Sequence, residues 1–253
     1  MVRFCITFLF TATVASSATL YAIVDLGAPA LPANLPGVPS GTLPGGSWSA
    51  IYGSNGSGDY AGYGDTADGH FRAFVWSASS GMKVLGTLGG ADSWAMALNE
   101  EEAVAGHSTT ASGFIHAFVE ENGHMFDLGT LGGESSYAYG INEFGVVVGY
   151  SVTPDGNEHA FITNGGSMTD LNSLVSRDSG WLLTAAYSID DAGRITGAGI
   201  FNGAMREYRL DPLPGALSAL NASLSAPVPE PSTMIVTGAA LALLARILRT
   251  SRG

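Results

Sequence analysis

Hydrophobic and polar residues alternate, or form short apolar runs, through most of the chain between residues 47 and 210. This period of two predicts β-strands, because successive side chains of a strand point to opposite faces of a sheet. Segments such as Asn142-Glu143-Phe144-Gly145 separate the runs, and residues of these types favour tight turns. The sequence therefore predicts an all-β fold. In the stretch with the clearest pattern, the predicted strands are 136–141, 146–151, 159–163 and 167–171.

The strand pattern repeats with an offset of 43 or 44 residues. Leu85-Gly86-Thr87-Leu88-Gly89-Gly90 recurs as Leu128-Gly129-Thr130-Leu131-Gly132-Gly133, and His116-Ala117-Phe118 recurs as His159-Ala160-Phe161. Four short strands in a unit of this length match the size of a β-propeller blade. The other repeat anchors are Arg72-Ala73-Phe74, Arg206-Glu207-Tyr208, Leu98-Asn99, Ile141-Asn142, Ile189-Asp190 and the glycine-ended strands 103–106, 146–149 and 195–197.

The last unit lacks one strand. Three units (47–86, 93–128 and 135–171) carry four predicted strands each, whereas the fourth supplies only 184–189, 194–200 and 204–210. The N-terminal segment 21–27 shares its Asp-Leu-Gly ending with 125–129, so we predict that 21–27 pairs with 204–210. Such pairing would close a four-bladed propeller and leave no open sheet edge. An open stack of β-sheets and a sandwich are the alternatives.

Both ends of the chain have the composition of targeting segments. Residues 1–18 combine a basic start, an apolar stretch and a small-residue ending, which is typical of a secretory signal peptide; a buried N-terminal helix is the alternative. Residues 19–210 form the predicted β-domain, and residues 211–226 form a linker rich in Pro, Ala, Ser and Leu. A proline-rich motif follows, then an apolar stretch short for a membrane span and an arginine-rich end. The arginines are expected to stay cytoplasmic, which leaves the body outside.

This C-terminal segment, 227–253, resembles the PEP-CTERM sorting signal of Gram-negative bacteria. The body anchors resemble the HAF extracellular repeat, named for its His-Ala-Phe. These resemblances imply export across the inner membrane, processing by the transpeptidase exosortase, and a cell-surface or extracellular place among exopolysaccharide. One apolar helix would anchor the chain until processing. The residues that carry the signal are Val228, Pro229, Glu230, Pro231, Ser232 and Thr233, followed by Arg246, Arg249 and Arg252.

Composition and charge exclude several classes of function. The net charge is −12, and between residues 19 and 233 six basic residues stand against 22 acidic ones. This balance excludes nucleic acid as a partner, because nothing there neutralises phosphates. The one cysteine, Cys5, lies in the predicted signal peptide, so thiol catalysis and cysteine metal sites are excluded from the mature protein.

Candidate chemistry is sparse. His116 and His159 recur at the repeat period, which favours a structural role, and no nucleophile elbow or phosphate loop occurs. The acidic groups at Asp59, Asp65 and Asp68 and at Asp190-Asp191 do not follow an EF-hand spacing, so solvated turns are favoured over calcium. We therefore expect no catalytic residues, metal or cofactor. The favoured function is a noncatalytic surface or matrix protein that binds exopolysaccharide or another surface protein; the alternative is a secreted carbohydrate-active hydrolase using acidic residues.

Overall fold

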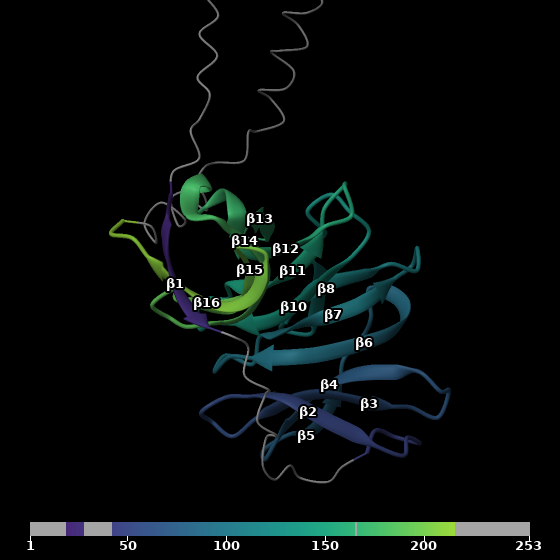
Figure 1. Ribbon diagram of the computed structural model, residues 1–253. Helices are drawn as coiled ribbons and strands as arrows, with labels where there is room; N and C mark the ends of the chain where they lie inside the picture. The colour runs from purple at the N-terminus through teal and green to yellow at the C-terminus, as the bar shows by residue number, and fades with distance from the viewer. Residues whose placement is uncertain (1–18, 28–41, 165, 216–253) are drawn as a thin grey trace, which may run out of the picture. The chain divides into compact units, whose positions relative to one another are not determined.

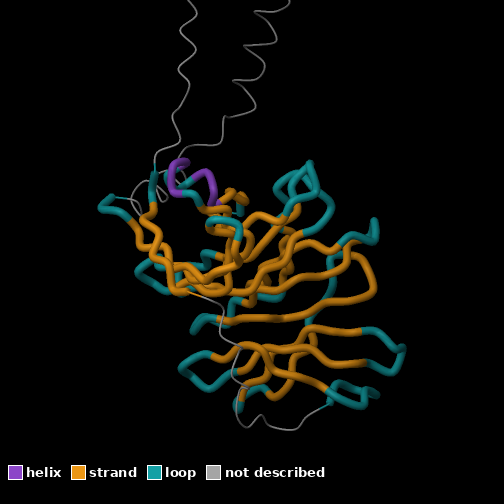
Figure 2. Tube along the Cα trace, in the orientation of Figure 1, coloured by secondary structure: helices purple, strands orange, loops and turns teal. Residues whose placement is uncertain are grey.

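The computed structural model describes residues 19–27, 42–164 and 166–215. These residues form four antiparallel sheets of four strands each, shown in Figures 1 and 2, so the all-β prediction is confirmed. Two short 3-10 turns, η1 (Leu171–Ser173) and η2 (Arg177–Ser179), are the helical segments of this part of the chain. The predicted signal peptide and sorting signal lie outside the described residues, as do residues 216–226 of the predicted linker. Asp211 and Pro212, at the start of that predicted linker, belong to a strand instead.

Each sheet corresponds to one sequence repeat. The first sheet contains β2 (Ser49–Ser54), β3 (Tyr60–Asp65), β4 (Phe71–Ser77) and β5 (Gly81–Val84). The second contains β6 (Gly89–Leu98), β7 (Val104–Thr110), β8 (Ile115–Glu121) and β9 (His124–Asp127). The third contains β10 (Ser136–Ile141), β11 (Val147–Val152), β12 (Glu158–Asn164) and β13 (Ser167–Asp170). The fourth contains β14 (Trp181–Ile189), β15 (Ile195–Phe201), β16 (Ala204–Pro212) and β1 (Tyr21–Gly27).

The N-terminal strand completes the fourth sheet, as predicted. β1 pairs antiparallel with β16, with Val24 opposite Arg209 and Asp25 opposite Tyr208, although the two strands lie at opposite ends of the β-domain in sequence (Figure 1). The backbone N–H of Leu213 also donates to the carbonyl oxygen of Leu20 at 2.9 Å. β16 runs to Pro212, two residues beyond the predicted strand.

Successive sheets pack on each other through the predicted repeat anchors. Phe118 lies in one buried cluster with Ala61 and Ala73 of the first sheet, and Phe161 lies in another with Ala105 and Ala117 of the second sheet. The alanines leave room for the ring of the next sheet, since close-packed interiors tolerate few voids. The third sheet contacts β14 of the fourth. The anchor rings Phe74, Phe118, Phe161 and Tyr208 are all fully buried.

Each second strand contains a glycine that a close approach of two strands requires. The predicted strands 103–106, 146–149 and 195–197 end at this glycine, whereas the observed strands continue beyond it. A Cβ on Gly149 would lie 1.9 Å from the carbonyl oxygen of Tyr137 and 2.9 Å from the Phe161 ring. The first strand of the sheet is bulged at this level, between Ala138 and Gly140, and bulges bring backbone into positions that only glycine can face. Glycine recurs at the equivalent positions 62, 106 and 197.

The Asn anchors link each sheet to the next. The Nδ2 of Asn99 donates to the carbonyl oxygen of Asn142 at 3.1 Å, and the Nδ2 of Asn142 donates to that of Asp190 at 3.3 Å. Asn55 donates in the same way to Asn99 at 3.2 Å. Each side chain also caps its own turn; for example, the Oδ1 of Asn99 accepts from the N–H of Ala103 at 2.9 Å. The Asn of the repeat anchors therefore forms a series of hydrogen-bonded polar groups from sheet to sheet.

Candidate ligand-binding surface

The repeated histidines form one half of a side-chain pair between the third and fourth strands of a sheet. The Nδ1 of His116 lies 2.9 Å from the Oδ2 of Asp127, and the Nδ1 of His159 lies 2.7 Å from the Oδ2 of Asp170. Each histidine is thus held by the aspartate 11 residues later, inside its own repeat. This geometry supports a structural role for both histidines.

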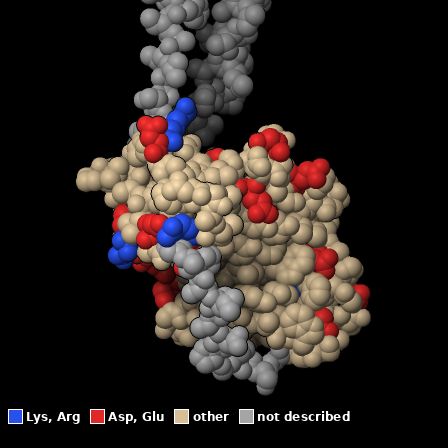
Figure 3. Space-filling model, in the orientation of Figure 1, with Lys and Arg blue, Asp and Glu red and all other residues tan. Residues whose placement is uncertain are grey.

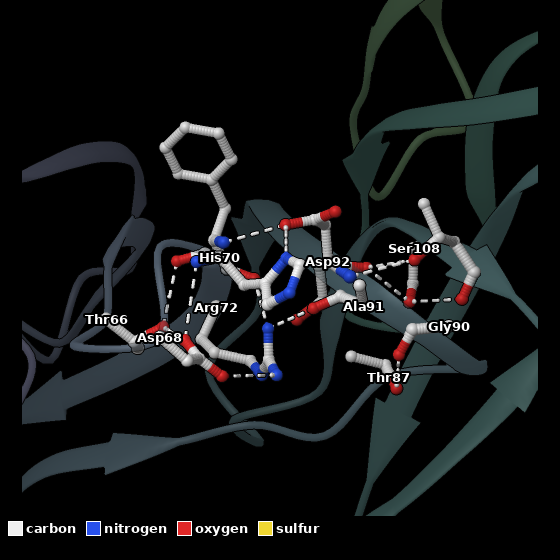
Figure 4. A network of polar contacts seen from close by, with 12 residues as sticks. Thr66, Asp68, His70, Arg72, Thr87, Gly90, Ala91, Asp92 and Ser108 are labelled. Carbon is white, nitrogen blue, oxygen red and sulfur yellow. Dashed lines mark hydrogen bonds and ion pairs between the residues drawn. The ribbon is translucent and has the colours of Figure 1, made fainter.

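The first sheet meets the second through a polar network that contains His70 and Asp68 (Figure 4). The guanidinium of Arg72 donates to the carbonyl oxygens of Phe71 and Ala91 and lies 3.7 Å from Asp68. The Nδ1 of His70 lies 3.4 Å from Asp92. The network therefore joins strands of the first and second sheets.

The acidic residues of the first sheet do not converge. Asp65 accepts hydrogen bonds from the N–H groups of Ser47 and Trp48 at 2.8 and 2.7 Å. The hydrogen bond from the Ser47 hydroxyl, followed by these backbone hydrogen bonds, holds the pKa of the Asp65 carboxyl below the usual value. Asp59 accepts from Asn55 within its own turn at 3.1 Å. Among the residues that the structure describes, no group of His, Cys, Asp and Glu could hold a metal ion.

A hollow of about 230 Å³ lies at the turns of the second and third sheets. Three carboxylates, those of Glu101, Glu121 and Glu143, line it beside the exposed ring of Phe144. Glu101 and Glu121 are exposed to solvent, and the Oε2 of Glu143 accepts a hydrogen bond from the N–H of Glu100 at 2.9 Å. The three carboxylates therefore line the hollow without being buried in it.

A continuous row of aromatic side chains crosses all four sheets. We call it the aromatic row, and its members, in order of contact, are Tyr52, Tyr63, Trp94, His107, Tyr137, Tyr150, Tyr139 and Tyr187. Neighbouring ring centroids are between 4.7 Å and 6.4 Å apart, which is the range of favourable aromatic pairs. Trp48 and Phe71 join the row beside Tyr63.

The repeat itself builds the row. Tyr63, His107 and Tyr150 occupy one position in the second strand of successive sheets, where each pairs with the residue 13 positions earlier. Tyr139 and Tyr187 occupy equivalent positions in β10 and β14, two residues before the isoleucines of the Ile-Asn and Ile-Asp anchors. The sequence reasoning missed this row, although aromatic residues at the repeat offset were a usable signal.

The row is electrically neutral at ordinary pH. Burial, with a hydrogen bond to Tyr52, raises the pKa of Tyr63 to about 12, and the two hydroxyl oxygens lie 3.0 Å apart. Burial lowers the pKa of His107 to about 4, and a hydrogen bond to the backbone of Ala138, which raises the pKa, offsets only part of this effect. Burial followed by the charges of Glu207 and Glu158 raises the pKa of Tyr187. Glu158 pairs with Val152, two residues after Tyr150, so one carboxylate lies on the same face of the third sheet as this end of the row.

The two ends of the row are accessible. Tyr52 is 42% exposed and Tyr187 is 49% exposed, whereas Trp94 and Tyr137 in the middle are half-buried. Exposed rings backed by packed rings form a rigid apolar surface with hydroxyl groups at its edge. Such a surface can stack on a flat apolar group and exchange hydrogen bonds with it.

The predicted sorting residues, 228–233 and the three arginines after 245, lie outside the described residues. Within the described part of the chain, no helix is long and apolar enough to span a membrane.

Comparisons with known proteins add little. No family model matches the sequence, and no curated protein matches it. Two solved structures that resemble it are crystal structures of AofleA from Arthrobotrys oligospora, one of them of a triple arginine-to-alanine mutant. Each aligns at a TM-score of 0.36 and 12% identity, over 65% of this chain and 56% of the other. The match thus spans little more than half of AofleA, and at this similarity it carries no argument about fold or function.

Proposed function

We propose that this protein is a noncatalytic, exported protein of the bacterial surface or extracellular matrix, and that its β-domain binds a polysaccharide along the aromatic row. The row is the observation that carries the proposal. Sugar rings have apolar C–H faces surrounded by hydroxyl groups, which suit a tyrosine and tryptophan surface with polar edges. Because sheet packing fixes most of the rings, little side-chain freedom is lost on binding.

A binding experiment tests this function. The purified protein is titrated with neutral, basic and acidic oligosaccharides in a calorimeter, with Tyr187→Ala, Tyr52→Ala and the control Phe144→Ala. Phe144 is the most exposed aromatic ring described and lies outside the row. We expect Tyr187→Ala or Tyr52→Ala to weaken binding about tenfold, as loss of an interface anchor does, and Phe144→Ala to leave it unchanged. Absence of binding to every glycan would contradict the proposal.

The alternative is a carbohydrate-active hydrolase. After burial, the charges of Glu207 and Glu158 raise the pKa of the Tyr187 hydroxyl, so these two carboxylates are the candidate catalytic pair. A glycosidase needs such a pair on opposite sides of the scissile bond. Release of reducing ends from any bound glycan, abolished in Glu207→Gln, would favour the hydrolase and overturn the noncatalytic proposal.

We also propose that the chain belongs with HAF-repeat proteins that carry a PEP-CTERM signal and are exosortase substrates. The support is the ordered succession of a proline-rich motif, a short apolar stretch and terminal arginines. Glu230→Ala, or removal of residues 246–253, is expected to block release of the body in a host that carries an exosortase, as followed by fractionation and intact mass. Wild-type body released with Arg252 attached would contradict this proposal.

The four sheets are proposed to form a propeller-like body fastened by β1. Support comes from the strand order, in which β1 is the outermost strand of the fourth sheet. A closed ring further requires the first and fourth sheets to meet, so spin labels at positions 52 and 187 should be as close as labels at 139 and 187. A much longer distance for the first pair would favour the open stack.

A further inference from the structure

The two ends of the aromatic row differ at one position of the repeat. Glu158 is the first residue of β12, and its equivalent in the first sheet, the first residue of β4, is Phe71. Phe71 contacts Trp48, Tyr63 and Trp94, and the carboxylates at this end, Asp65 and Asp92, accept hydrogen bonds from the backbone N–H groups of Trp48 and Phe71. At this position of the repeat, the first sheet therefore has an aromatic ring and the third sheet has a carboxylate.

Towards the fourth-sheet end, a carboxylate lies beside the row, because Glu158 pairs with Val152, two residues after Tyr150, and therefore shares a face of the third sheet with Tyr150. The negative charge of Glu158 adds to burial in raising the pKa of Tyr139, Tyr150 and Tyr187, and Glu207 acts on Tyr187 as well. Glu158 is exposed to solvent, so a ligand lying on Tyr187 can reach it. This end of the row therefore combines an apolar ring surface with accessible negative charge.

The basic residues of the protein do not compensate for these acids. Of the six Lys and Arg residues in the described ranges, five form salt bridges with carboxylates. The net charge of the chain is −12, and the face shown in Figure 3 carries more acidic than basic side chains. An acidic glycan would meet repulsion and few unpaired cations. The salt bridges are Arg72–Asp68, Lys83–Glu120, Arg194–Asp190, Arg206–Asp25 and Arg209–Asp211.

We infer that the ligand is a glycan that carries free amino groups. This inference rests on the proposed glycan-binding function and adds the chemical class of the sugar. The sugar ring would stack on Tyr187, with its ammonium group beside Glu158. An ammonium group is attracted both by carboxylates and by the faces of neutral aromatic rings, and the raised tyrosine pKa values keep those rings neutral.

Three oligosaccharides of equal length separate the possibilities: a glucosamine oligomer, its fully N-acetylated form and a galacturonic acid oligomer. Binding of each to the full-length protein is measured by calorimetry at slightly acidic pH, where the amines are charged. We expect the glucosamine oligomer to bind at least tenfold more tightly than the other two. Acetylation removes the charge and keeps the sugar ring, so the first comparison isolates the amino group.

A matched pair of variants locates the effect. Glu158→Gln is expected to weaken glucosamine binding about two- to fivefold, the value of one exposed ion pair, and to leave binding of the acetylated oligomer unchanged. Glu134→Gln removes an equal charge from an exposed glutamate outside the row and is expected to have no effect. Circular dichroism of both variants confirms that the sheets are retained.

The outcomes distinguish the two proposals. If none of the three oligomers binds, the glycan-binding function itself fails. If the acetylated or acidic oligomer binds as tightly as the amine, the function stands and the amino-sugar inference is overturned. Equal weakening by Glu134→Gln and Glu158→Gln would also overturn it, because the attraction would then come from total charge.

Discussion

The third and fourth sheets have the same architecture but different chain connectivity. The third is built from consecutive strands, β10 to β13, whereas the fourth takes its outermost strand from the N-terminus. The side-chain pair of the third sheet, His159 with Asp170 at 2.7 Å, is matched in the fourth by Arg206 with Asp25 at 2.9 Å. The aspartate of β1 is therefore used in the same way as Asp127 and Asp170 inside the repeats, and covalent continuity is not needed for the pairing.

The two sheets differ at the small residue of the anchor. Ala160 of the third sheet is fully buried, whereas its counterpart in the fourth sheet is Glu207, which is only half-buried. Among the described residues no sheet follows the fourth along the chain, so a large charged residue fits there. In the degenerate copy Arg206-Glu207-Tyr208, Arg206 still pairs two strands and Tyr208 still fills the core. Glu207 replaces the alanine that packs against the next sheet in the other repeats.

The largest expected effect concerns the core ring of each sheet. Phe161→Ala should lower the free energy of unfolding by about 3–5 kcal/mol, because the ring is fully buried. Tyr208→Phe in the fourth sheet should cost only about 1 kcal/mol, since it removes one hydrogen bond, from the hydroxyl to the carbonyl oxygen of Ala185 at 2.8 Å. Urea unfolding measures both values.

Two further variants complete this test. Phe118→Ala should match Phe161→Ala, and His116→Ala should cost less than either, because the His116–Asp127 pair is partly exposed. Unchanged melting of the phenylalanine variants would show that the repeat register is wrong.

The next effect concerns pH and the middle of the aromatic row. The folded-state pKa of His107 is about 4, against 6.5 for the free side chain. The unfolded chain therefore binds the proton first, and stability is complete above pH 6.5 and falls as the pH drops towards 4. The loss reaches roughly 3 kcal/mol at 1.36 kcal/mol per pH unit. His107→Phe should flatten this part of a stability-against-pH curve; an unchanged slope would exclude His107 as the cause.

A smaller effect, of opposite sign, is expected at a turn. Glu102 has a left-handed backbone with φ of 60°, whereas glycine holds the equivalent turn position, with φ between 72° and 84°, in the other three sheets. Glu102→Gly should stabilise the protein by about 0.5–1 kcal/mol. The substitution removes the cost of a left-handed backbone at a non-glycine residue, and the greater conformational entropy of glycine in the unfolded chain offsets part of this gain. Glu101→Gly, its neighbour, should destabilise it. Thermal melting of both variants distinguishes a turn effect from a charge effect.

The smallest effect tests the N-terminal strand. Asp25→Asn should cost no more than about 1 kcal/mol, because the Arg206–Asp25 salt bridge is partly exposed, and the cost should shrink at high salt. Asp127→Asn in the second sheet is the matched variant within one repeat. A much larger loss for Asp25→Asn, insensitive to salt, would mean that this ion pair does more than its counterpart to hold the sheet together.

Much of the fold could be predicted from the sequence. The period-two pattern gave the strands, and the repeated Phe, Gly and Asn anchors gave the register, because each repeat must bury the same ring and turn at the same residues. The pairing of β1 with β16 was also predictable, since 21–27 shares the Asp-Leu-Gly ending of a fourth strand. The histidine pairs were predicted only as structural, because the sequence does not show that His116 meets Asp127.

The candidate binding surface was decided by the tertiary structure. Tyr52, Trp94 and Tyr187 are far apart in sequence, and nothing local shows that their rings join one row. Contact between rings depends on how each sheet packs on the next, and exposure depends on what covers them. The alternation of the sequence determined which side chains share a face of a sheet, whereas only the packing of four sheets decided that these rings meet and that the two ends of the row remain open to a ligand.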